Sequence, residues 1–263
     1  MEKIAFIGMG NMAQALAAGF IKSKKIKAAN IFAFAPNQEK LARNAKKLHF
    51  IPCKTVQDAV KSADTIFFSC KPYQIESVLL ETSSLLKNKT IVSIALGWNF
   101  KRFAESKIFN SNESHIQFVM PNTPAMVGEG VFLFEKTNSL EPQKRADLWA
   151  LFEKLGLVEE LPDNLMAIGG AISGCGPAFA DLFIESYADA AVKYGIPRST
   201  AYRLVSKMLA GSAKLQLETG IHPAVLKDNV TSPAGSTIRG VAALEENGLR
   251  NACIKSIDAI MNM

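Results

Sequence analysis

A glycine-rich turn directly after the first apolar run limits the possible folds most strongly. Residues 3–7 read Lys-Ile-Ala-Phe-Ile, and residues 8–13, Gly-Met-Gly-Asn-Met-Ala, follow at once and open an amphipathic stretch. In this pattern Gly8 allows a tight strand-to-helix turn, Gly10 lets the backbone approach a pyrophosphate, and Ala13 lets the helix pack closely on the strand. We therefore expect a dinucleotide-binding β-α-β unit. The alternative is that the two glycines only form a turn.

Short apolar runs alternate with amphipathic stretches through the first 161 residues. The runs lie at residues 4–7, 31–34, 65–70, 90–95, 116–120, 131–134 and 157–161, and a helical pattern covers 142–155. Residues 65–70 and 90–95 are apolar on both alternations, as expected of central strands buried on two faces. This rhythm predicts an α/β Rossmann domain over residues 1–161, with a mostly parallel, doubly wound sheet.

The chain after Pro162 has a different pattern. Apolar and small residues recur with a 3.6-residue period, as in Phe179, Phe183 and Tyr187, and glycine or proline separates the helical stretches. We expect an all-α domain over residues 162–263. Its Ala-, Ser- and Gly-rich faces favour close packing against a second copy of the chain, so dimerisation is one hypothesis. The alternative is a monomer whose helices pack back on the sheet.

The composition argues against several classes of protein. With 48% hydrophobic and 21% charged residues the chain can bury a core, and a net charge of +6 without long basic tracts favours small anionic ligands over nucleic acid. The four cysteines and three histidines are scattered without metal-ligand spacing, so we expect reduced thiols and no metal site. We expect no signal peptide before the first strand and no apolar run of about 18 residues, which predicts a cytoplasmic protein that does not enter the membrane.

The residues after the first helix indicate which dinucleotide binds. NAD-specific domains carry an acidic residue about 20 residues beyond the glycine turn, where it binds the ribose hydroxyl. From Lys3 to Gln38 this sequence has no Asp or Glu, although five lysines are present. We therefore predict NADPH, with NADH as a second cofactor that the site can accept, and we expect Asn37 near the additional phosphate. Lys24 and Lys25 fit a solvated helix end better than direct ligands.

Three further motifs follow predicted strands and should meet at the carboxyl edge of the sheet, where open α/β sheets bind ligands. They are Ser69-Cys70-Lys71-Pro72, Ile94-Ala95 and Met120-Pro121-Asn122. Lys71, before a proline, is more typical of a cap or a phosphate neighbour than of a catalytic lysine, and the 120–124 loop has a plain turn as its alternative. The expected cofactor contacts are Ile7, Gly8, Met9, Gly10, Asn11, Met12, Ala35, Asn37, Ser69, Cys70, Lys71, Pro72, Ile94, Ala95, Met120, Pro121 and Asn122.

Two motifs in the second half are candidates for substrate chemistry. Residues 174–177, Gly-Cys-Gly-Pro, open the predicted long helix with a proline in its first turn, and no histidine lies near Cys175 in sequence to support a nucleophilic role. Residues 228–237 carry hydroxyl groups and small side chains into the next predicted helix, where the amides can converge on an anion. The alternative is that Ser236 or Thr237 only caps that helix.

Taken together, these motifs resemble the pyrroline-5-carboxylate reductase family. The resemblance runs in order through residues 8–13, 92–95, 120–124, 173–178 and 228–237. It implies an enzyme that reduces Δ1-pyrroline-5-carboxylate to proline with NAD(P)H in the last step of proline biosynthesis. It also implies a homodimer, often within a larger homo-oligomer, whose subunits share the active site. Substrate binding by Ser232, Gly235, Ser236 and Thr237 is implied as well, with Thr237 as the catalytic residue.

Two positions depart from the family pattern. Ala234 stands where the family usually has glycine, which matters if that residue needs a positive φ. Cys175 stands where the family commonly has serine. These departures bear on the fine geometry of substrate binding and leave the assignment unchanged.

Two other functions stay open. The β-hydroxyacid dehydrogenases share this layout but carry a catalytic lysine four residues after the Gly-x-Gly turn, where this chain has Ala180. Oxidising an alcohol requires a group that accepts its proton, whereas reducing an imine does not. The second alternative is a non-enzymatic protein that binds NADP(H) and a partner through its helices. Such a protein would not need the hydroxyl groups of residues 231–237.

Overall fold

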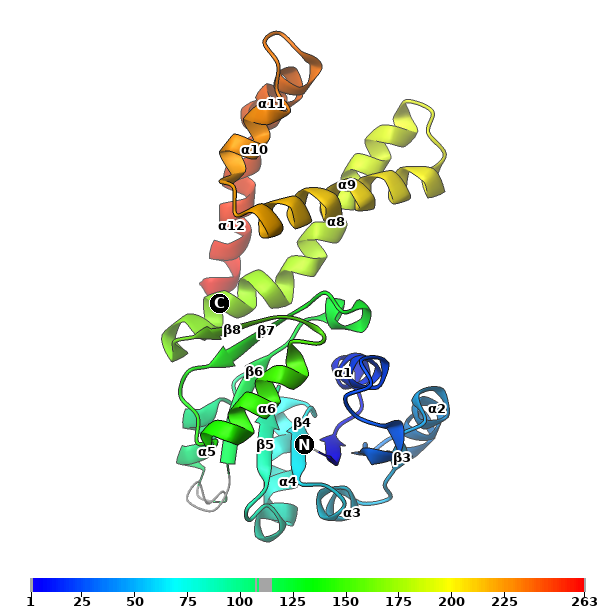
Figure 1. Cartoon of the computed structure of the whole chain (residues 1–263), viewed down its shortest axis with the longest axis vertical. Helices are drawn as coiled ribbons and strands as arrows, with labels where there is room; N and C mark the ends of the chain where they lie inside the picture. Colours follow the sequence, from blue (N-terminus) through cyan, green and yellow to red (C-terminus); the bar gives the residue numbers. More distant parts are fainter. Residues whose placement is uncertain (1, 107, 109–114, 263) are drawn as a thin grey trace. The chain divides into compact units, whose positions relative to one another are not determined.

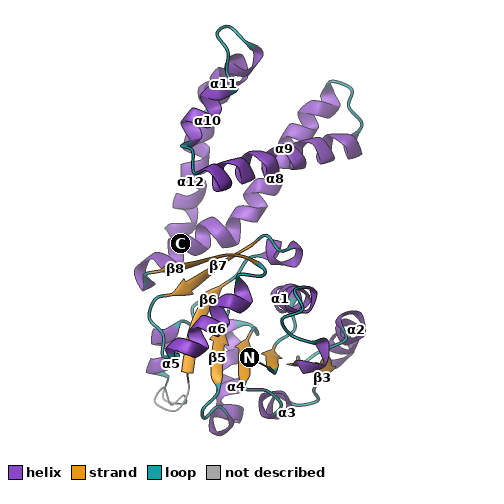
Figure 2. Ribbon diagram, viewed as in Figure 1, coloured by secondary structure: helices purple, strands orange, loops and turns teal. Residues whose placement is uncertain are grey.

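The computed structural model describes residues 2–106, 108 and 115–262, and the chain divides into two compact units, Met1–Gly174 and Cys175–Met263. The first unit combines strands and helices, whereas the second is helical throughout its described residues (Figures 1 and 2). This arrangement confirms the predicted fold class.

The first unit contains an eight-stranded sheet with the strand order β3-β2-β1-β4-β5-β6-β7-β8. The strands are β1 (Ile4–Ile7), β2 (Ile31–Phe34), β3 (Ile51–Pro52), β4 (Thr65–Phe68), β5 (Thr90–Ser93), β6 (His115–Met120), β7 (Gly130–Glu135) and β8 (Gly156–Leu161). Only β6 and β7 pair antiparallel among the paired strands. The strand order reverses beside β1, which is where open α/β sheets form a ligand crevice. The short edge strand β3 was not among the predicted strands.

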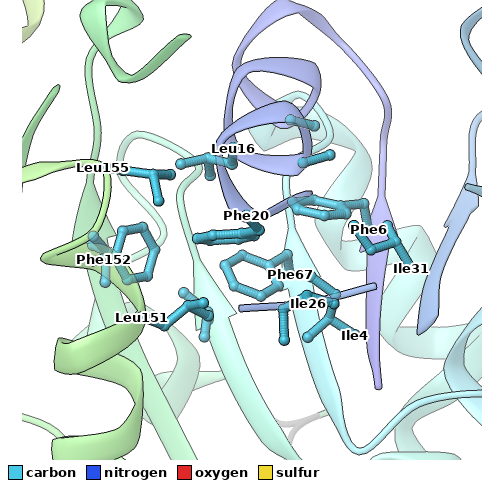
Figure 3. Close-up of a cluster of buried hydrophobic side chains, with 14 of the residues drawn as sticks. Ile4, Phe6, Leu16, Phe20, Ile26, Ile31, Phe67, Leu151, Phe152 and Leu155 are labelled. Carbon is cyan, nitrogen blue, oxygen red and sulfur yellow. The ribbon is translucent and has the colours of Figure 1, made fainter. Parts of the chain in front are cut away.

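Helices cover both faces of this sheet, because successive side chains of a strand point to opposite sides. They are α1 (Asn11–Lys22), α2 (Gln38–Leu48), α3 (Val56–Lys61), α4 (Ile75–Thr82), α5 (Phe100–Glu105) and α6 (Pro142–Phe152). Ile4 and Phe6 of β1 belong to one buried cluster, together with residues of α1, α2 and α6, whereas Ala5 and Ile7 belong to the opposite one, with residues of α3, α4 and α5. Figure 3 shows Phe6, Phe20, Phe67 and Phe152 in the first of these clusters.

The segment after Pro162 is helical, as expected, and its first helix begins before residues 174–177. Helix α7 (Met166–Gly170) leads through a π-helical turn, Ala171–Cys175, into α8 (Gly176–Lys193). Helix α8 has Pro177 in its first turn, as predicted, but helical structure already precedes it. Met166 is buried against Phe118 and Leu133 of the sheet. Because of this packing, the compact unit extends to Gly174, and the predicted domain boundary after residue 161 stays a prediction.

The second unit consists of α8, α9 (Arg198–Thr219), α10 (Pro223–Asn229), α11 (Ser236–Glu246) and α12 (Leu249–Met261). Helices α8 and α9 pack side by side (Figure 1). Among its described residues only Ala188, Ala201 and Val205 are buried, while large apolar side chains such as Leu182 are exposed. The unit by itself therefore has very little core.

One helical stretch, Asp163–Lys193, is long and apolar enough to cross a membrane. Its most apolar segment of 18 residues has a mean hydropathy of 1.4, and 17% of that segment is buried. The sequence analysis expected no run of this kind. Small residues raise the hydropathy of this stretch without making a continuous run of large apolar side chains. Length and composition alone do not distinguish a membrane span from a helix that another protein surface covers.

Candidate cofactor and substrate sites

The turn between β1 and α1 requires a glycine at its first position. Gly8 has φ +99°, and its N–H donates to the carbonyl oxygen of Phe34 over 2.8 Å. A Cβ atom at Gly8 would lie 2.6 Å from the backbone nitrogen of Cys70. Both the backbone conformation and the close approach of the β4 end therefore exclude a side chain.

The next residues present backbone donors to an open space. Gly10 is the N-cap of α1 and makes no side-chain cap hydrogen bond, and the first turn of the helix holds no acidic residue. The first amides of a helix have no intrahelical acceptor, and the helix dipole makes this end positive. A Cβ atom at Gly10 would meet nothing within 4 Å. This donor set and the space before it fit a pyrophosphate group.

A cleft of about 830 Å³ adjoins this turn and runs along the carboxyl ends of β1, β2, β4 and β5. Most of the predicted cofactor residues line it, namely Gly8, Met9, Gly10, Asn11, Met12, Ala35, Asn37, Ser69, Cys70, Lys71, Pro72, Ile94 and Ala95. Ile7 lines a smaller adjoining pocket that also contains Lys54. Met120, Pro121 and Asn122 are not among the described residues that line either space.

The end of β2 is basic. The Asn37 side chain caps α2 by accepting a hydrogen bond from the Lys40 N–H at 2.8 Å, and Lys40 itself lines the cleft. No carboxylate occurs among the described residues of this cleft. Lys40 is not among the predicted cofactor residues, although its place in the first turn after Asn37 was a usable signal. An additional phosphate on the ribose would be attracted by the Lys40 ammonium group, while Glu39, also in the first turn of α2, is not among the described residues that line the cleft.

The loop after β4 is tied to the glycine turn. Ser69 Oγ donates to the carbonyl oxygen of Gly8 at 2.7 Å, so the serine fixes the turn. Burial raises the pKa of the Cys70 thiol to about 11, which keeps it protonated and unsuited to nucleophilic chemistry. Lys71 is exposed, and its N–H donates to Gln74 Oε1. The Trp98 indole N–H donates to the Pro72 carbonyl at 2.9 Å, joining this loop to the one after β5.

The side-chain amide of Asn122 forms hydrogen bonds within the protein through both its nitrogen and its oxygen. Its Nδ2 donates to the carbonyl oxygen of Ser173 at 3.0 Å, and its Oδ1 accepts from the Val131 N–H at 2.8 Å. Met120 packs against Gly170, where a Cβ atom would lie 2.1 Å from the methionine sulfur. These contacts use the side chains of Asn122 and Met120 within the protein, and the cofactor contacts of Met120, Pro121 and Asn122 stay predictions.

The predicted substrate loop lies in the second unit and contains a tight turn. Ala234 has φ +58°, and the Gly235 N–H donates to the Ser232 carbonyl at 3.0 Å. A non-glycine residue in this left-handed region is strained by about 1–2 kcal/mol. The alanine at this position, where the family usually has glycine, therefore carries a backbone strain that glycine would avoid. A Cβ atom at Gly235 would lie 2.4 Å from Ser232 Oγ and 3.1 Å from the Ser232 carbonyl oxygen, so a side chain there would require the serine hydroxyl to move.

Helix α11 begins directly after this turn, at Ser236. Its N-cap is Gly235, without a side-chain cap hydrogen bond, and no acidic residue occurs in the first turn. Ser236 and Thr237 are therefore the first two helical residues, and the alternative in which one of them caps the helix is wrong. The Thr237 side chain is exposed. Amides and a hydroxyl at a helix N-terminus suit a small anion that also needs a hydrogen-bond donor.

Comparisons with known families match both parts of the chain. Residues 163–263 match the family model described as pyrroline-5-carboxylate reductase dimerisation. Residues 3–97 match the model described as NADP oxidoreductase, coenzyme F420-dependent. The first match covers the predicted helical domain, and the second covers the N-terminal part of the predicted α/β domain.

Individual relatives match along almost the whole chain. A pyrroline-5-carboxylate reductase of Treponema pallidum is 41% identical over 261 residues, covering 98% of each chain. The reductase of Escherichia coli is 37% identical, covering 99% of this chain and 96% of its own. The crystal structure of a Plasmodium falciparum pyrroline carboxylate reductase with NADP bound has a TM-score of 0.87 at 32% identity, covering 98% of this chain and 95% of that one. This chain belongs to the pyrroline-5-carboxylate reductase family.

Proposed function

We propose that this chain reduces the C=N bond of Δ1-pyrroline-5-carboxylate to give L-proline, with hydride from NADPH, in the last step of proline biosynthesis. The observation that carries the proposal is the 41% identity over 98% of both chains with a reductase of that name. The dinucleotide cleft supports it, because its donors and its basic end suit NADPH. NADH is a weaker alternative cofactor.

The bound cofactor supplies the hydride, and the residues of the first unit hold it. The amides at the start of α1, after Gly10, bind the pyrophosphate, and Asn37 and Lys40 face the phosphate on the adenosine ribose. Ala95, at the end of β5, lies toward the nicotinamide end of the cleft. This assignment follows the order in which the strand ends line the cleft.

The loop of the second unit binds the substrate in this proposal. The amides of Gly235, Ser236 and Thr237 hold the substrate carboxylate and so orient the ring, while Ser232 shapes the turn beneath them. The Thr237 hydroxyl hydrogen-bonds the ring nitrogen of the protonated imine and keeps the C=N bond polarised while hydride reaches the ring carbon. The nitrogen then already carries the proton that the product amine needs. The start of α11 without a side-chain cap supports this role, because the hydroxyl is not used to begin the helix.

We also propose that the protein is a homodimer through its second unit, with an active site that the subunits share. The match of residues 163–263 to a dimerisation family supports this, as do the exposed apolar side chains of α8 and α9. A subunit interface would cover the apolar helix Asp163–Lys193 without any need for a membrane.

One assay separates the proposal from its alternatives. Purified protein is mixed with NADPH and racemic Δ1-pyrroline-5-carboxylate, and the nicotinamide absorbance is followed. We expect consumption of NADPH that depends on both protein and substrate. A β-hydroxyacid dehydrogenase would instead reduce NADP⁺ with a hydroxy acid, and a non-enzymatic binding protein would bind NADPH without turnover. Either result would contradict the proposed function.

A further inference from the structure

Two contacts join the end of β6 to the helical segment that follows the sheet. Met120 packs on Gly170, and Asn122 Nδ2 donates to the Ser173 carbonyl at 3.0 Å. Gly170 and Ser173 are three residues apart, so they lie on one side of a helix. Asn122 is 5% exposed and Ser173 is 9% exposed, so the hydrogen bond between them is shielded from water.

The Ser173 carbonyl needs a partner from outside the regular helix pattern. In an α-helix it would accept from the N–H of residue 177, but residue 177 is proline and has no N–H. A proline ring also clashes with the carbonyl four residues before it. The chain forms a π-helical turn at Ala171–Cys175 in this place, and the Asn122 amide supplies a donor. Such π-helical turns occur frequently at functional sites.

The amide oxygen of Asn122 joins its side chain to the sheet. Its Oδ1 accepts from the Val131 N–H of β7 at 2.8 Å, so both polar ends of the amide are used. Strand β6 pairs parallel with β5, with Phe118 opposite Ser93. Two residues further along, Met120 therefore stands level with Ala95, which lines the cofactor cleft one strand away. Asn122 thus sits at the strand end next to the proposed nicotinamide end.

We infer that Asn122 is a positioning residue for hydride transfer: by tying the 120–124 loop to the π-helical turn, it fixes the backbone that borders the nicotinamide end of the cleft. The inference rests on the proposed function, and it places the side chain behind this backbone instead of on the cofactor. It predicts that losing the Ser173 hydrogen bond slows the reaction while leaving NADPH affinity almost unchanged.

The test compares two isosteric substitutions on the same strand. Asn122→Asp keeps the acceptor for Val131 and loses the donor to Ser173. Gln117→Glu is the matched control, because Gln117 is also fully buried. Its Nε2 donates to the carbonyls of Glu135 at 2.7 Å and Phe118 at 2.9 Å, and its Oε1 accepts from Arg145, so the variant keeps the acceptor and loses both donated hydrogen bonds. If the aspartate variant does not fold, Asn122→Ser takes its place in the test, because it removes the amide without adding a charge.

Four quantities are measured on folded samples. They are kcat, the Kd for NADPH from its fluorescence, the isotope effect with deuterated NADPH, and hydrogen exchange of the peptide covering residues 166–177. For Asn122→Asp we expect kcat to fall by about tenfold to a hundredfold, with a larger isotope effect and faster exchange in that peptide. The Kd should change by less than about threefold, and Gln117→Glu should keep wild-type kcat.

The outcomes separate this inference from the proposed function. Wild-type kcat in a folded Asn122 variant, or an equal loss in both variants, would overturn the positioning role. A large rise in the NADPH Kd would overturn it as well, because it would place Asn122 on the cofactor. A wild-type protein that does not reduce Δ1-pyrroline-5-carboxylate refutes the proposed function, and the exchange data then still show whether Asn122 holds the turn.

Discussion

The two glycines of the β1–α1 turn differ in what a side chain would meet. At Gly8 an added Cβ would contact the backbone of Cys70, whereas at Gly10 it would meet only open space, and φ of Gly10 is −77°. The first glycine is therefore needed for folding, and the second is not. The space before Gly10 is needed only by a ligand.

Gly10→Val should consequently separate folding from cofactor binding. We expect a melting temperature close to that of the wild type and a loss of NADPH affinity of about a hundredfold, equivalent to ~3 kcal/mol, because the branched side chain occupies the phosphate path. Fluorescence titration with NADPH and thermal unfolding of the same sample measure both. Gly8→Val, in contrast, should fail to fold. Unchanged NADPH affinity in folded Gly10→Val would contradict the placement of the pyrophosphate.

Thr237→Val tests the proposed catalytic hydroxyl. The substitution keeps the shape of the side chain and removes one hydrogen bond worth roughly 1–3 kcal/mol, so kcat/KM should fall by about 5- to 150-fold. Because Gly235 is the N-cap of α11, the melting temperature should hardly change. Thr237→Ser, which keeps the hydroxyl, should lose much less activity. Wild-type kinetics in the valine variant would remove Thr237 from the mechanism.

At the scale of elements, buried polar groups connect helices and loops to the sheet. Glu135 at the end of β7 is 1% exposed, and its Oε2 accepts from the Phe100 N–H at the start of α5 over 2.8 Å. Burial raises the pKa of this carboxyl above its ordinary value of 4.5, more than the hydrogen bond from Phe100 lowers it. The folded protein therefore binds this proton more tightly than the unfolded chain.

This shift makes stability depend on pH in a defined direction. The contribution of Glu135 is largest below pH 4.5 and is lost as the pH rises through the raised pKa of the folded state. Glu135→Gln keeps an acceptor for Phe100 and cannot ionise. Relative to wild type, its free energy of unfolding should be higher at about pH 8 than at about pH 4, as measured by urea unfolding. Exposed Glu129→Gln is the control, and an identical pH trend in both variants would contradict this role.

We predict that the carboxyl end of β2 sets the cofactor preference. We expect the wild-type protein to use NADPH at least as well as NADH. Ala35→Asp should shift kcat/KM toward NADH by about tenfold or more, because the carboxylate repels the additional phosphate and accepts a hydrogen bond from the ribose. Ala29→Asp adds the same charge just before β2, at the opposite edge of the sheet, and should leave the preference unchanged. A wild-type protein that strongly prefers NADH at equal concentrations would contradict this assignment.

At the scale of the whole molecule, the two units differ in how much apolar surface they bury. The first has a buried cluster on each face of its sheet, whereas the described part of the second buries only Ala188, Ala201 and Val205. A helical unit with so few buried residues lacks a core of its own and needs another surface to cover it. The proposed dimer provides that surface.

Leu182→Asp tests this dimer. Leu182 in α8 is 63% exposed, and Leu80 in α4 of the first unit is 69% exposed, so Leu80→Asp is the matched control. Light scattering at micromolar concentration should find wild type and Leu80→Asp without monomer. Leu182→Asp should dissociate and lose activity, because a buried unpaired charge is costly at an interface. A fully active monomer would contradict both the dimer and the shared site.

Local patterns were sufficient to predict most of the framework. The strand at Ile4–Ile7, the turn at Gly8 and the following helix all depend on short-range sterics and periodicity, and the structure confirms them. The same holds for α9, whose end at Gly220 follows from a left-handed C-cap. Strand β3, with two residues, carries too little pattern to be recognised.

What the sequence by itself determined is therefore the elements, their order and the residues that gather at one edge of the sheet, because side-chain size and backbone freedom act over a few residues. Only the tertiary structure decided which neighbouring groups each side chain meets. The Asn122 side chain hydrogen-bonds Ser173 and Val131, which its place after β6 did not predict. Lys40 lines the cleft, although it was not among the predicted cofactor residues. Such contacts join residues far apart in the chain, and hydrogen bonds and burial across those distances leave no periodic trace in the sequence.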